Sequence, residues 1–261
     1  MDSMDQTLAA EWAALQKARV FFGHQSVGKD ILGGLQDLAE KAGLPAPNVI
    51  RAGEGDALPE SFLLHAFVGE NEKPDSKCRS METYLRAAPP AGFDAALMKF
   101  CYIDFNRHTD VEAVLADYKG MMEGLKARHP HTVFVHATVP LTSISTRNRL
   151  TAPIKRLLGR PHPESGNIKR NQFNRRLLET FPGEPVFDLA AAESTFPDGK
   201  RETFKAGSDI YYSLVNAYTY DGGHLNAAGS RRGAREFVRA LSGALALADS
   251  RKGAMSRSES P

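Results

Sequence analysis

Two short segments near opposite ends of the chain carry residue types that could perform covalent chemistry together. In the first, a turn of sequence GHQSVG at residues 23–28 places Ser26 where a predicted strand gives way to a predicted helix. A serine there lies at the positive end of a helix dipole, where backbone N–H groups can meet a developing oxyanion. The alternative is an N-cap serine, which is the commoner role of serine at a helix start.

In the second segment, DGGHLN at residues 221–226, Asp221 precedes His224 by three positions. On a tight turn this spacing lets the carboxylate accept a hydrogen bond from the imidazole Nδ1–H, which leaves Nε2 free as a general base. The glycines between the two residues permit such a turn. The alternative is a capping aspartate beside a solvent-exposed histidine. With Ser26, the pair predicts a serine nucleophile activated by an oriented histidine.

Taken together, the two segments resemble the SGNH/GDSL hydrolase superfamily, in which a serine follows the first strand and an Asp-x-x-His motif precedes the last helix. The segment at 221–226 is similar to that family's DGxHxN signature, and the resemblance extends from Val20 to about Ala248. It implies a divergent member that is a serine-dependent esterase or O-acyl (acetyl) transfer enzyme, with Ser26 as nucleophile, His224 as base and Asp221 as orienter. It also implies a small-molecule or carbohydrate ester as substrate, and no cofactor.

The resemblance further implies an oxyanion hole built from the N–H groups of Ser26 and of a glycine in the family's second block. Gly53 is the best match to that glycine, and Gly55 is the competing choice. The family's third block, Gly-x-Asn-Asp, corresponds here to FCYIDFN at residues 100–106, in which Asp104 is in register and the asparagine is absent. Three residues are candidates to supply the missing donor, and backbone groups alone are the other possibility: Lys99, Tyr102 and Asn106.

Several polar residues lie near the expected site and are candidates to line it: His24, Gln25, Lys99, Tyr102, Asp104, Asn106 and His136. His24 is interpreted either as a substrate contact or as a partner for its own turn. Lys99 interrupts an apolar stretch, and a buried lysine needs a partner, for which Asp104 and Glu54 are the candidates. His136 is expected at the rim of the crevice.

Two other function classes stay open at this point. A catalytically weak relative could use the same crevice to bind a glycan or an anionic ligand, which the absent asparagine favours. A metal-dependent phosphoesterase would need several residues to meet in one crevice: His24, Asp104, His136, Asp221 and His224. No His-x-His, His-Glu-x-x-His or paired-cysteine spacing supports a metal site, and no Gly-x-Gly-x-x-Gly or Walker loop supports a nucleotide.

Alternating strand and helix patterns must position these residues. Strands are predicted at residues 19–23, 48–51, 93–102, 132–136 and 186–189. Helices are predicted at residues 5–17, 26–43, 111–128, 167–180 and 227–248. This alternation predicts the α/β class, as a three-layer α/β/α sandwich around a flavodoxin-like parallel sheet of about five strands. We expect a single domain over residues 1–248 and a disordered tail over 249–261.

Composition and charge bound the function classes. The chain has 261 residues, of which 42% are hydrophobic and 25% are charged, so it is of ordinary globular composition. A net charge of +2 is too small for a whole-protein nucleic-acid binder. The basic segment 143–176 is interpreted as a solvated face or as a surface that favours an anionic substrate. The sequence does not indicate an oligomeric state.

Cysteine content and hydropathy indicate which cellular compartment to expect. Two cysteines make neither a disulfide framework nor a four-cysteine zinc site. Cys101 is expected to be buried, and Cys78 to be exposed in a surface excursion. No apolar stretch of about 18 residues predicts a membrane span, and the first residues lack a signal-peptide pattern. The chain as written is expected to be cytoplasmic, or periplasmic or secreted if a leader was removed.

Overall fold

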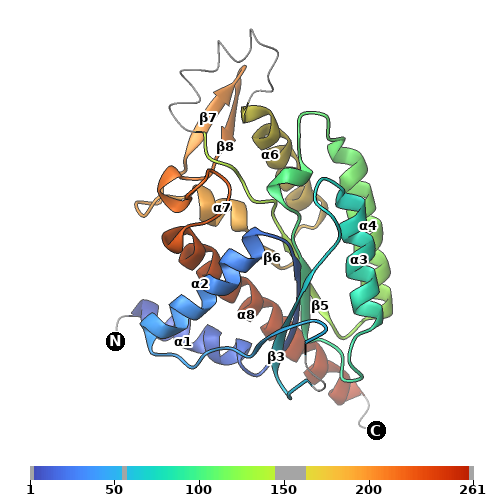
Figure 1. Cartoon of the computed structure of the whole chain (residues 1–261). Helices are drawn as coiled ribbons and strands as arrows, with labels where there is room; N and C mark the ends of the chain where they lie inside the picture. Colours follow the sequence, from blue (N-terminus) through green and yellow to red (C-terminus); the bar gives the residue numbers. More distant parts are fainter. Residues whose placement is uncertain (1–2, 55–57, 145–162, 259–261) are drawn as a thin grey trace.

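The computed structural model describes residues 3–54, 58–144 and 163–258, and a parallel sheet lies at its centre (Figure 1). The six strands follow the order β2-β3-β1-β4-β5-β6, and every neighbouring pair is parallel. Their bounds are β1 Arg19–His24, β2 Val49–Arg51, β3 Phe62–Phe67, β4 Ala95–Met98, β5 Val133–Ala137 and β6 Val186–Phe187. Without the short edge strand β2, the other five follow the 2-1-3-4-5 order of flavodoxin-like sheets.

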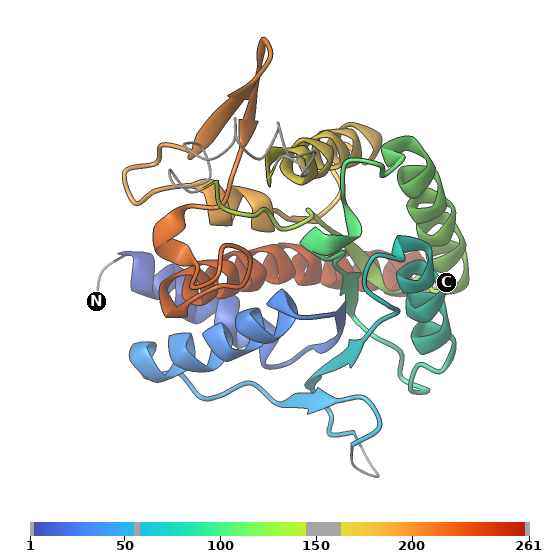
Figure 2. The same ribbon diagram turned by 45° about the horizontal axis from the view of Figure 1, so that its top comes forward.

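Helices cover both faces of the sheet and make it the middle of three layers (Figures 1 and 2). The helices are α1 Ser3–Leu15, α2 Val27–Ala42, α3 Pro74–Arg86, α4 Val111–Arg128, α6 Pro163–Thr180, α7 Leu189–Ser194 and α8 Ala227–Ser258. Along β1 the buried side chains alternate: Val20 and Phe22 join the core under α1, α2 and α8, whereas Phe21 joins the core under α3, α4 and α6. The predicted three-layer fold is confirmed.

Local sequence explains where the helices that flank the site begin and end. In α2, Ile31 and Leu35 recur on one face and are fully buried, and the helix ends at Gly43, whose φ of 64° is the left-handed conformation that glycine adopts readily. The Asp110 side chain accepts hydrogen bonds from the first N–H groups of α4 and so caps that helix. The residues at these positions therefore set one end of each helix.

Residues 69–80, expected to be a surface excursion, instead lead into the helix α3, and the strand β3, which was not predicted, precedes them. β3 pairs with both β1 and β2, and α3 packs its apolar face on the sheet. Because Cys78, Met81 and Leu85 recur at helical spacing, α3 buries all three, and the prediction that Cys78 is exposed is wrong. Burial also raises the pKa of the Cys78 thiol to about 12, so it stays protonated. Cys101 is buried as expected.

Other elements differ in length from the sequence-based prediction, or were not predicted. The predicted strand 93–102 is shorter, because after β4 the chain turns into the 3₁₀ helix η1 Tyr102–Asp104. Four elements between β6 and α8 were not indicated by the sequence patterns: the helix α7, the antiparallel hairpin of β7 Thr203–Ala206 and β8 Asp209–Tyr212, and η2 Asn216–Tyr218. α8 continues beyond Ala248 to Ser258, over residues expected to be a disordered tail. Across the described ranges, no helix combines the length and apolar character needed to cross a bilayer.

Candidate active site

Ser26 lies in the turn that joins β1 to α2, and its backbone has φ 42° and ψ −102°. A positive φ is unfavourable for a residue with a side chain and costs on the order of 1–3 kcal/mol, so the surrounding structure must hold the turn. The N–H of Gly28 donates to the Gln25 carbonyl and that of Lys29 to the Ser26 carbonyl. The Ser26 side chain makes no capping hydrogen bond to α2. The N-cap interpretation therefore does not account for this serine.

The Ser26 hydroxyl faces His224 instead. Its Oγ lies 2.6 Å from His224 Nε2, and His224 Nδ1 lies 2.6 Å from Asp221 Oδ2. The other carboxylate oxygen of Asp221 accepts hydrogen bonds from the backbone N–H groups of Gly223 and His224. Desolvation opposes ionisation of Asp221, but the hydrogen bonds from His224 and these N–H groups outweigh it and lower its pKa to about 2. The carboxylate is thus ionised and positioned to orient the imidazole.

Contacts between distant segments fix the loop that carries His224. The N–H of Leu225 donates to Asp30 in the first turn of α2, at 3.0 Å, and so ties the histidine loop to the helix that follows Ser26. Burial raises the pKa of the Asp30 carboxyl. Gly223 packs against Tyr102 so closely that a Cβ there would lie 2.7 Å from the tyrosine ring. A side chain at position 223 would therefore have to displace the Tyr102 ring.

The order of the sheet bears on the expected oxyanion hole. Gly53 follows β2, which β3 separates from β1, so it stands about two strand spacings, roughly 10 Å, from the strand that precedes Ser26. Gly69 follows β3, which pairs directly with β1. Gln25, beside Ser26, donates its side-chain N–H to the Gly69 carbonyl at 2.9 Å. The geometry therefore favours Gly69 over Gly53 as the second-block glycine, while Gly55 lies outside the described residues.

The backbone conformation and the packing of Gly69 both disfavour a side chain at this position. Its φ is 57°, and a Cβ there would lie 2.6 Å from the Lys77 backbone nitrogen at the start of α3. Gly53, in contrast, has open space around it. Among the hydrogen bonds of the described residues, none uses the N–H of Ser26 or of Gly69. Both donors are thus available to a ligand. The sequence signal that could have found Gly69 is its place directly after the apolar run at 62–68.

Four of the residues expected to line the site are buried and do not reach solvent: His24, Lys99, Asp104 and His136. Asp104 instead holds two loops together, because it pairs with Lys77 at 2.5 Å and accepts hydrogen bonds from the N–H groups of Cys101 and Glu72. It therefore fixes the loop after β3 against the loop after β4. The expectation that Asp104 or Glu54 pairs with Lys99 is wrong.

His24 and His136 point to opposite sides of the sheet. His24 packs on Phe22, and its Nε2 lies 3.0 Å from His65 Nδ1; burial, and then the charge of Lys99, lower its pKa to about 2. His136 is enclosed between α4 and α6, where it contacts the Tyr118 hydroxyl. Neither can touch a substrate in this structure, and they cannot share a metal ion. Over the described ranges, no group of three or more histidine, cysteine or acidic side chains could hold a metal.

The structure places Tyr102, Gln25 and Asn106 in different surroundings. The half-buried Tyr102 ring meets the His224 imidazole edge to face, with ring centres 5.7 Å apart, so it lies beside that histidine. Gln25 supports the neighbouring loop through Gly69. Asn106 is exposed and accepts a hydrogen bond from the N–H of His108 within its own turn. It borders a cavity of about 440 Å³ on the other side of Tyr102, between η1 and α6, and not the serine itself.

Lys99 does not supply the missing donor either. Its ammonium is fully buried, 3.4 Å from the Phe100 carbonyl oxygen, on the side of the sheet that carries α2 and α8. Tyr220, which the sequence analysis missed, is 68% exposed and stacks on the His224 ring at 5.9 Å. Its position directly before Asp221 was the available signal. Two tyrosines thus flank the imidazole, one half-buried and one open to solvent.

The basic segment 143–176 is described only in part, since residues 145–162 lie outside the described residues. Burial lowers the pKa of Arg170 to about 10, and its guanidinium donates to the Tyr102 carbonyl and the Thr142 hydroxyl. Arg176 is paired with Glu112. These two arginines are occupied by contacts within the protein, so a role of the segment toward an anionic substrate stays a prediction.

The sequence matches no protein-family model and no curated protein. Solved structures do resemble the chain. A protein from Streptococcus pneumonia, described provisionally as a platelet activating factor, aligns with 92% of this chain and 100% of its own, at 13% identity and a TM-score of 0.51.

Two further structures have lower TM-scores. A protein from Desulfitobacterium hafniense DCB-2, described provisionally as a lipolytic protein of G-D-S-L family, has 9% identity over 86% of this chain and 99% of its own, at a TM-score of 0.46. The periplasmic domain of a lipopolysaccharide acetyltransferase from Salmonella ser. Paratyphi A has 10% identity over 90% of this chain and 88% of its own, at 0.42. At these identities the likeness is one of fold, and the fold shared with the streptococcal protein is the one that the two sequence segments indicated.

Proposed function

We propose that this protein is a serine-dependent esterase or O-acyltransferase, a divergent relative of the SGNH/GDSL hydrolases. The observation that carries the proposal is the chain of two 2.6 Å contacts from Ser26 Oγ through the His224 ring to Asp221. The strained backbone of Ser26 supports it, because strain is retained at functional positions and α2 needs no serine cap here. The DGxHxN-like segment supports the family assignment.

In the proposed mechanism, Ser26 Oγ attacks the acyl carbonyl carbon while His224 Nε2 accepts the hydroxyl proton. Asp221 holds the Nδ1–H and stabilises the imidazolium that forms. The carbonyl oxygen, now an oxyanion, accepts hydrogen bonds from the N–H groups of Ser26 and Gly69. The tetrahedral intermediate then collapses, the alkoxide leaving group takes the proton from His224, and an acyl-serine remains. Water or an acceptor hydroxyl attacks the acyl-serine with His224 again as base, which releases the acid or a new ester.

The proposed substrate is an ester of a small molecule or of a carbohydrate. Tyr102 and Tyr220 flank the His224 imidazole, and Tyr220 leaves most of its surface to solvent. Aromatic rings beside an open site suit a ring-shaped alcohol, since they present a flat apolar surface next to the group that donates the proton. Asp221 is itself 43% exposed on its side chain, so the site is open enough for a bulky alcohol.

The test is labelling by a fluorophosphonate together with turnover of p-nitrophenyl acetate. We expect the native protein to hydrolyse the ester and to be labelled at Ser26, and the unfolded protein not to be labelled, since its serine has no base. Ser26→Ala should abolish both signals. Ser208→Ala, which changes an exposed serine of the β7–β8 hairpin, should abolish neither. Adding an acceptor alcohol and measuring its acylation separates transfer from hydrolysis.

Two results would contradict the proposal. One is hydrolysis that survives Ser26→Ala, and the other is a label on a different serine. Folded protein that gives neither turnover nor label would make the crevice a binding site, which is the alternative that the absent third-block asparagine favours.

A further inference from the structure

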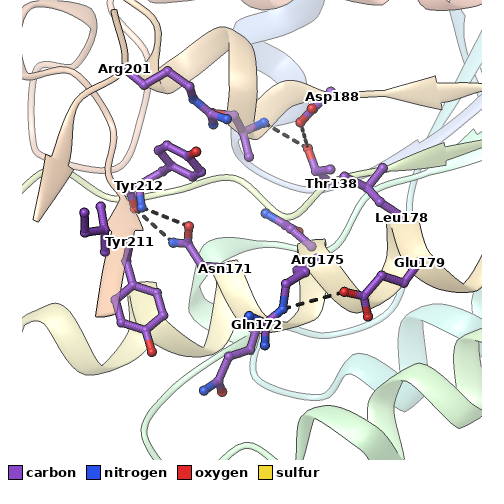
Figure 3. A pocket seen from close by; sticks show the side chains of 13 residues that line it. Thr138, Asn171, Gln172, Arg175, Leu178, Glu179, Asp188, Arg201, Tyr211 and Tyr212 are labelled. Atoms are coloured by element: carbon purple, nitrogen blue, oxygen red, sulfur yellow. Dashed lines mark hydrogen bonds and ion pairs between the residues drawn. The ribbon is translucent and has the colours of Figure 1, made fainter. Parts of the chain in front are cut away.

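A second cavity, of about 450 Å³, lies at the same end of the sheet as Ser26 but over its far edge (Figure 3). Side chains of α6, of the junction between β6 and α7, and of β8 enclose it. β6 is three strands away from β1 in the sheet, so the cavity stands roughly 14 Å from the nucleophile by strand spacing. It is therefore separate from the site described above, and within reach of a chain-like substrate.

The wall formed by β8 is held in place by specific contacts. The Asn171 side chain donates to the Tyr212 carbonyl and accepts from the Tyr212 N–H, both at 2.9 Å (Figure 3). These hydrogen bonds join α6 to β8. The Arg201 guanidinium lies 3.5 Å from the centre of the Tyr212 ring, and it donates to the Ser194 hydroxyl. These contacts fix an aromatic ring at the cavity mouth, where Tyr212 remains 39% exposed.

The cavity combines apolar surface with a carboxylate oxygen that has no partner. Leu178 and Ile210 are 41% and 62% exposed, and both line the cavity, so they give it apolar surface. Asp188 Oδ1 accepts hydrogen bonds from the Thr138 hydroxyl and the Ala191 N–H. No hydrogen bond of the described residues uses Oδ2 of this half-buried side chain. The carboxylate is thus held rigidly by one oxygen and offers the other.

The charges around the cavity balance. Two arginines, Arg175 and Arg201, face two carboxylates, Asp188 and Glu179. A phosphate or a polyanion would meet a carboxylate as well as an arginine, and a fatty-acyl chain would leave the Asp188 oxygen buried without a partner. A neutral sugar fits both features, because its C–H face packs on an aromatic ring while its hydroxyls donate to a carboxylate oxygen and accept from arginine or amide groups.

We propose that this cavity binds a neutral saccharide unit through the Tyr212 ring, the Asp188 carboxylate and the apolar surface of Leu178. Binding itself is independent of catalysis. Its role as a distal subsite for an acylated oligosaccharide rests on the proposed function, since the ester would then lie at Ser26 a few sugar units away. The hairpin β7–β8 would be the element that gives the enzyme its preference for a saccharide chain over a small ester.

The experiment is a calorimetric titration of Ser26→Ala protein, which cannot turn over substrate, with neutral oligosaccharides of glucose, N-acetylglucosamine and xylose at millimolar concentration. We expect at least one to bind. Leu178→Asp, which puts a charge on the apolar surface, and Tyr212→Leu, which removes the ring, should each weaken binding by about tenfold. Leu247→Asp is the matched control, because Leu247 is 44% exposed on α8, away from the cavity, and it should leave binding unchanged. Asp188→Asn keeps the capping oxygen and should also weaken binding.

Thermal unfolding of each variant separates loss of binding from loss of the fold, and Leu178→Asp, on an exposed position, keeps the test valid if Tyr212→Leu unfolds. The proposal is wrong if none of the neutral oligosaccharides binds, or if binding is equally strong in Leu178→Asp and Leu247→Asp protein. Failure of the proposed function has a different signature: saccharide binding at the cavity persists, while wild-type protein neither turns over an ester nor reacts with a fluorophosphonate at Ser26.

Discussion

Asp221 is the residue whose charge the rest of the site depends on. Because its pKa is lowered to about 2, the carboxylate is ionised near neutral pH and loses its charge only as the pH falls toward that value. Asp221→Asn removes the charge and leaves the shape. We expect kcat for ester hydrolysis to fall roughly 10³- to 10⁴-fold, less than in Ser26→Ala protein. Steady-state kinetics on both variants measure this. If kcat of Asp221→Asn protein stays within twofold of the wild-type value, that result argues against a triad.

Gly53 and Gly69 are the two candidates for the oxyanion hole, and we expect alanine substitution to affect kcat differently at each. Gly53→Ala faces open space on an outer strand and should leave kcat within about twofold, with a small loss of stability from its φ of 86°. Gly69→Ala brings a Cβ against the Lys77 backbone, so it should displace the N–H and lower kcat by roughly 10²- to 10³-fold. Kinetics with parallel melting curves distinguish them. If Gly53→Ala is the more damaging to kcat, the assignment by sheet order is wrong.

At the scale of elements, the buried pair of Lys77 and Asp104 joins α3 to η1. Lys77→Met leaves the Asp104 carboxylate uncompensated in the interior, and we expect the free energy of unfolding to fall by about 3–5 kcal/mol. Adding Asp104→Asn should recover part of that loss, since the isolated charge is then gone. Urea unfolding of the two single variants and the double variant measures the coupling. Additive losses would mean that the two side chains do not interact.

The elements that sequence patterns predicted are those whose apolar residues form a regular pattern within a short segment. The runs that form β1, β4 and β5 are apolar throughout, and α2 repeats apolar residues at helical spacing. β3 was missed although FLLHAF is an apolar run, because the polar residues after it suggested a loop. α3 was missed because a lysine stands on its buried face, where Lys77 is neutralised by a partner distant in sequence.

The site was predictable to the same extent. Ser26, Asp221 and His224 carry their chemistry in short motifs, and the structure brings their side chains together as the motifs imply. Gly53 was preferred to Gly69 because the assignment followed chain order, whereas the strand beside β1 is set by sheet order. The buried state of His24, Lys99 and His136 depends on which face of a strand each occupies and on what covers that face. No spacing along the chain contains that information.

At the scale of the whole molecule, one buried carboxyl should shape stability against pH. Glu193 is 2% exposed, and burial raises its pKa to about 8 despite the nearby Lys99 and Arg170. Its folded-state pKa thus exceeds the ordinary value of 4.5. The folded protein therefore holds a proton that the unfolded chain releases, and this stability, fully present below about pH 4.5, is lost as the pH rises through about 8.

Glu193→Gln cannot titrate and keeps an acceptor for the Leu141 N–H. We expect its free energy of unfolding, relative to wild type, to increase by on the order of 3 kcal/mol between about pH 5 and pH 8.5. Chemical denaturation across that range measures the difference. Glu40→Gln, at an exposed glutamate on α2, is the control and should show no such trend. A flat difference for Glu193→Gln would show that this carboxyl ionises normally.

The hydrogen bond from Leu225 to Asp30 spans nearly the whole chain, and so does the contact between Ser26 and His224, whose positions differ by 198. A ribosome therefore delivers Ser26 long before it delivers His224. Throughout most of translation the nascent chain carries a serine with the reactivity of an ordinary alcohol. In the proposed mechanism, competence for acyl chemistry arises only after His224 has been synthesised and has folded against Ser26, so a chain that stalls before His224 cannot attack an ester.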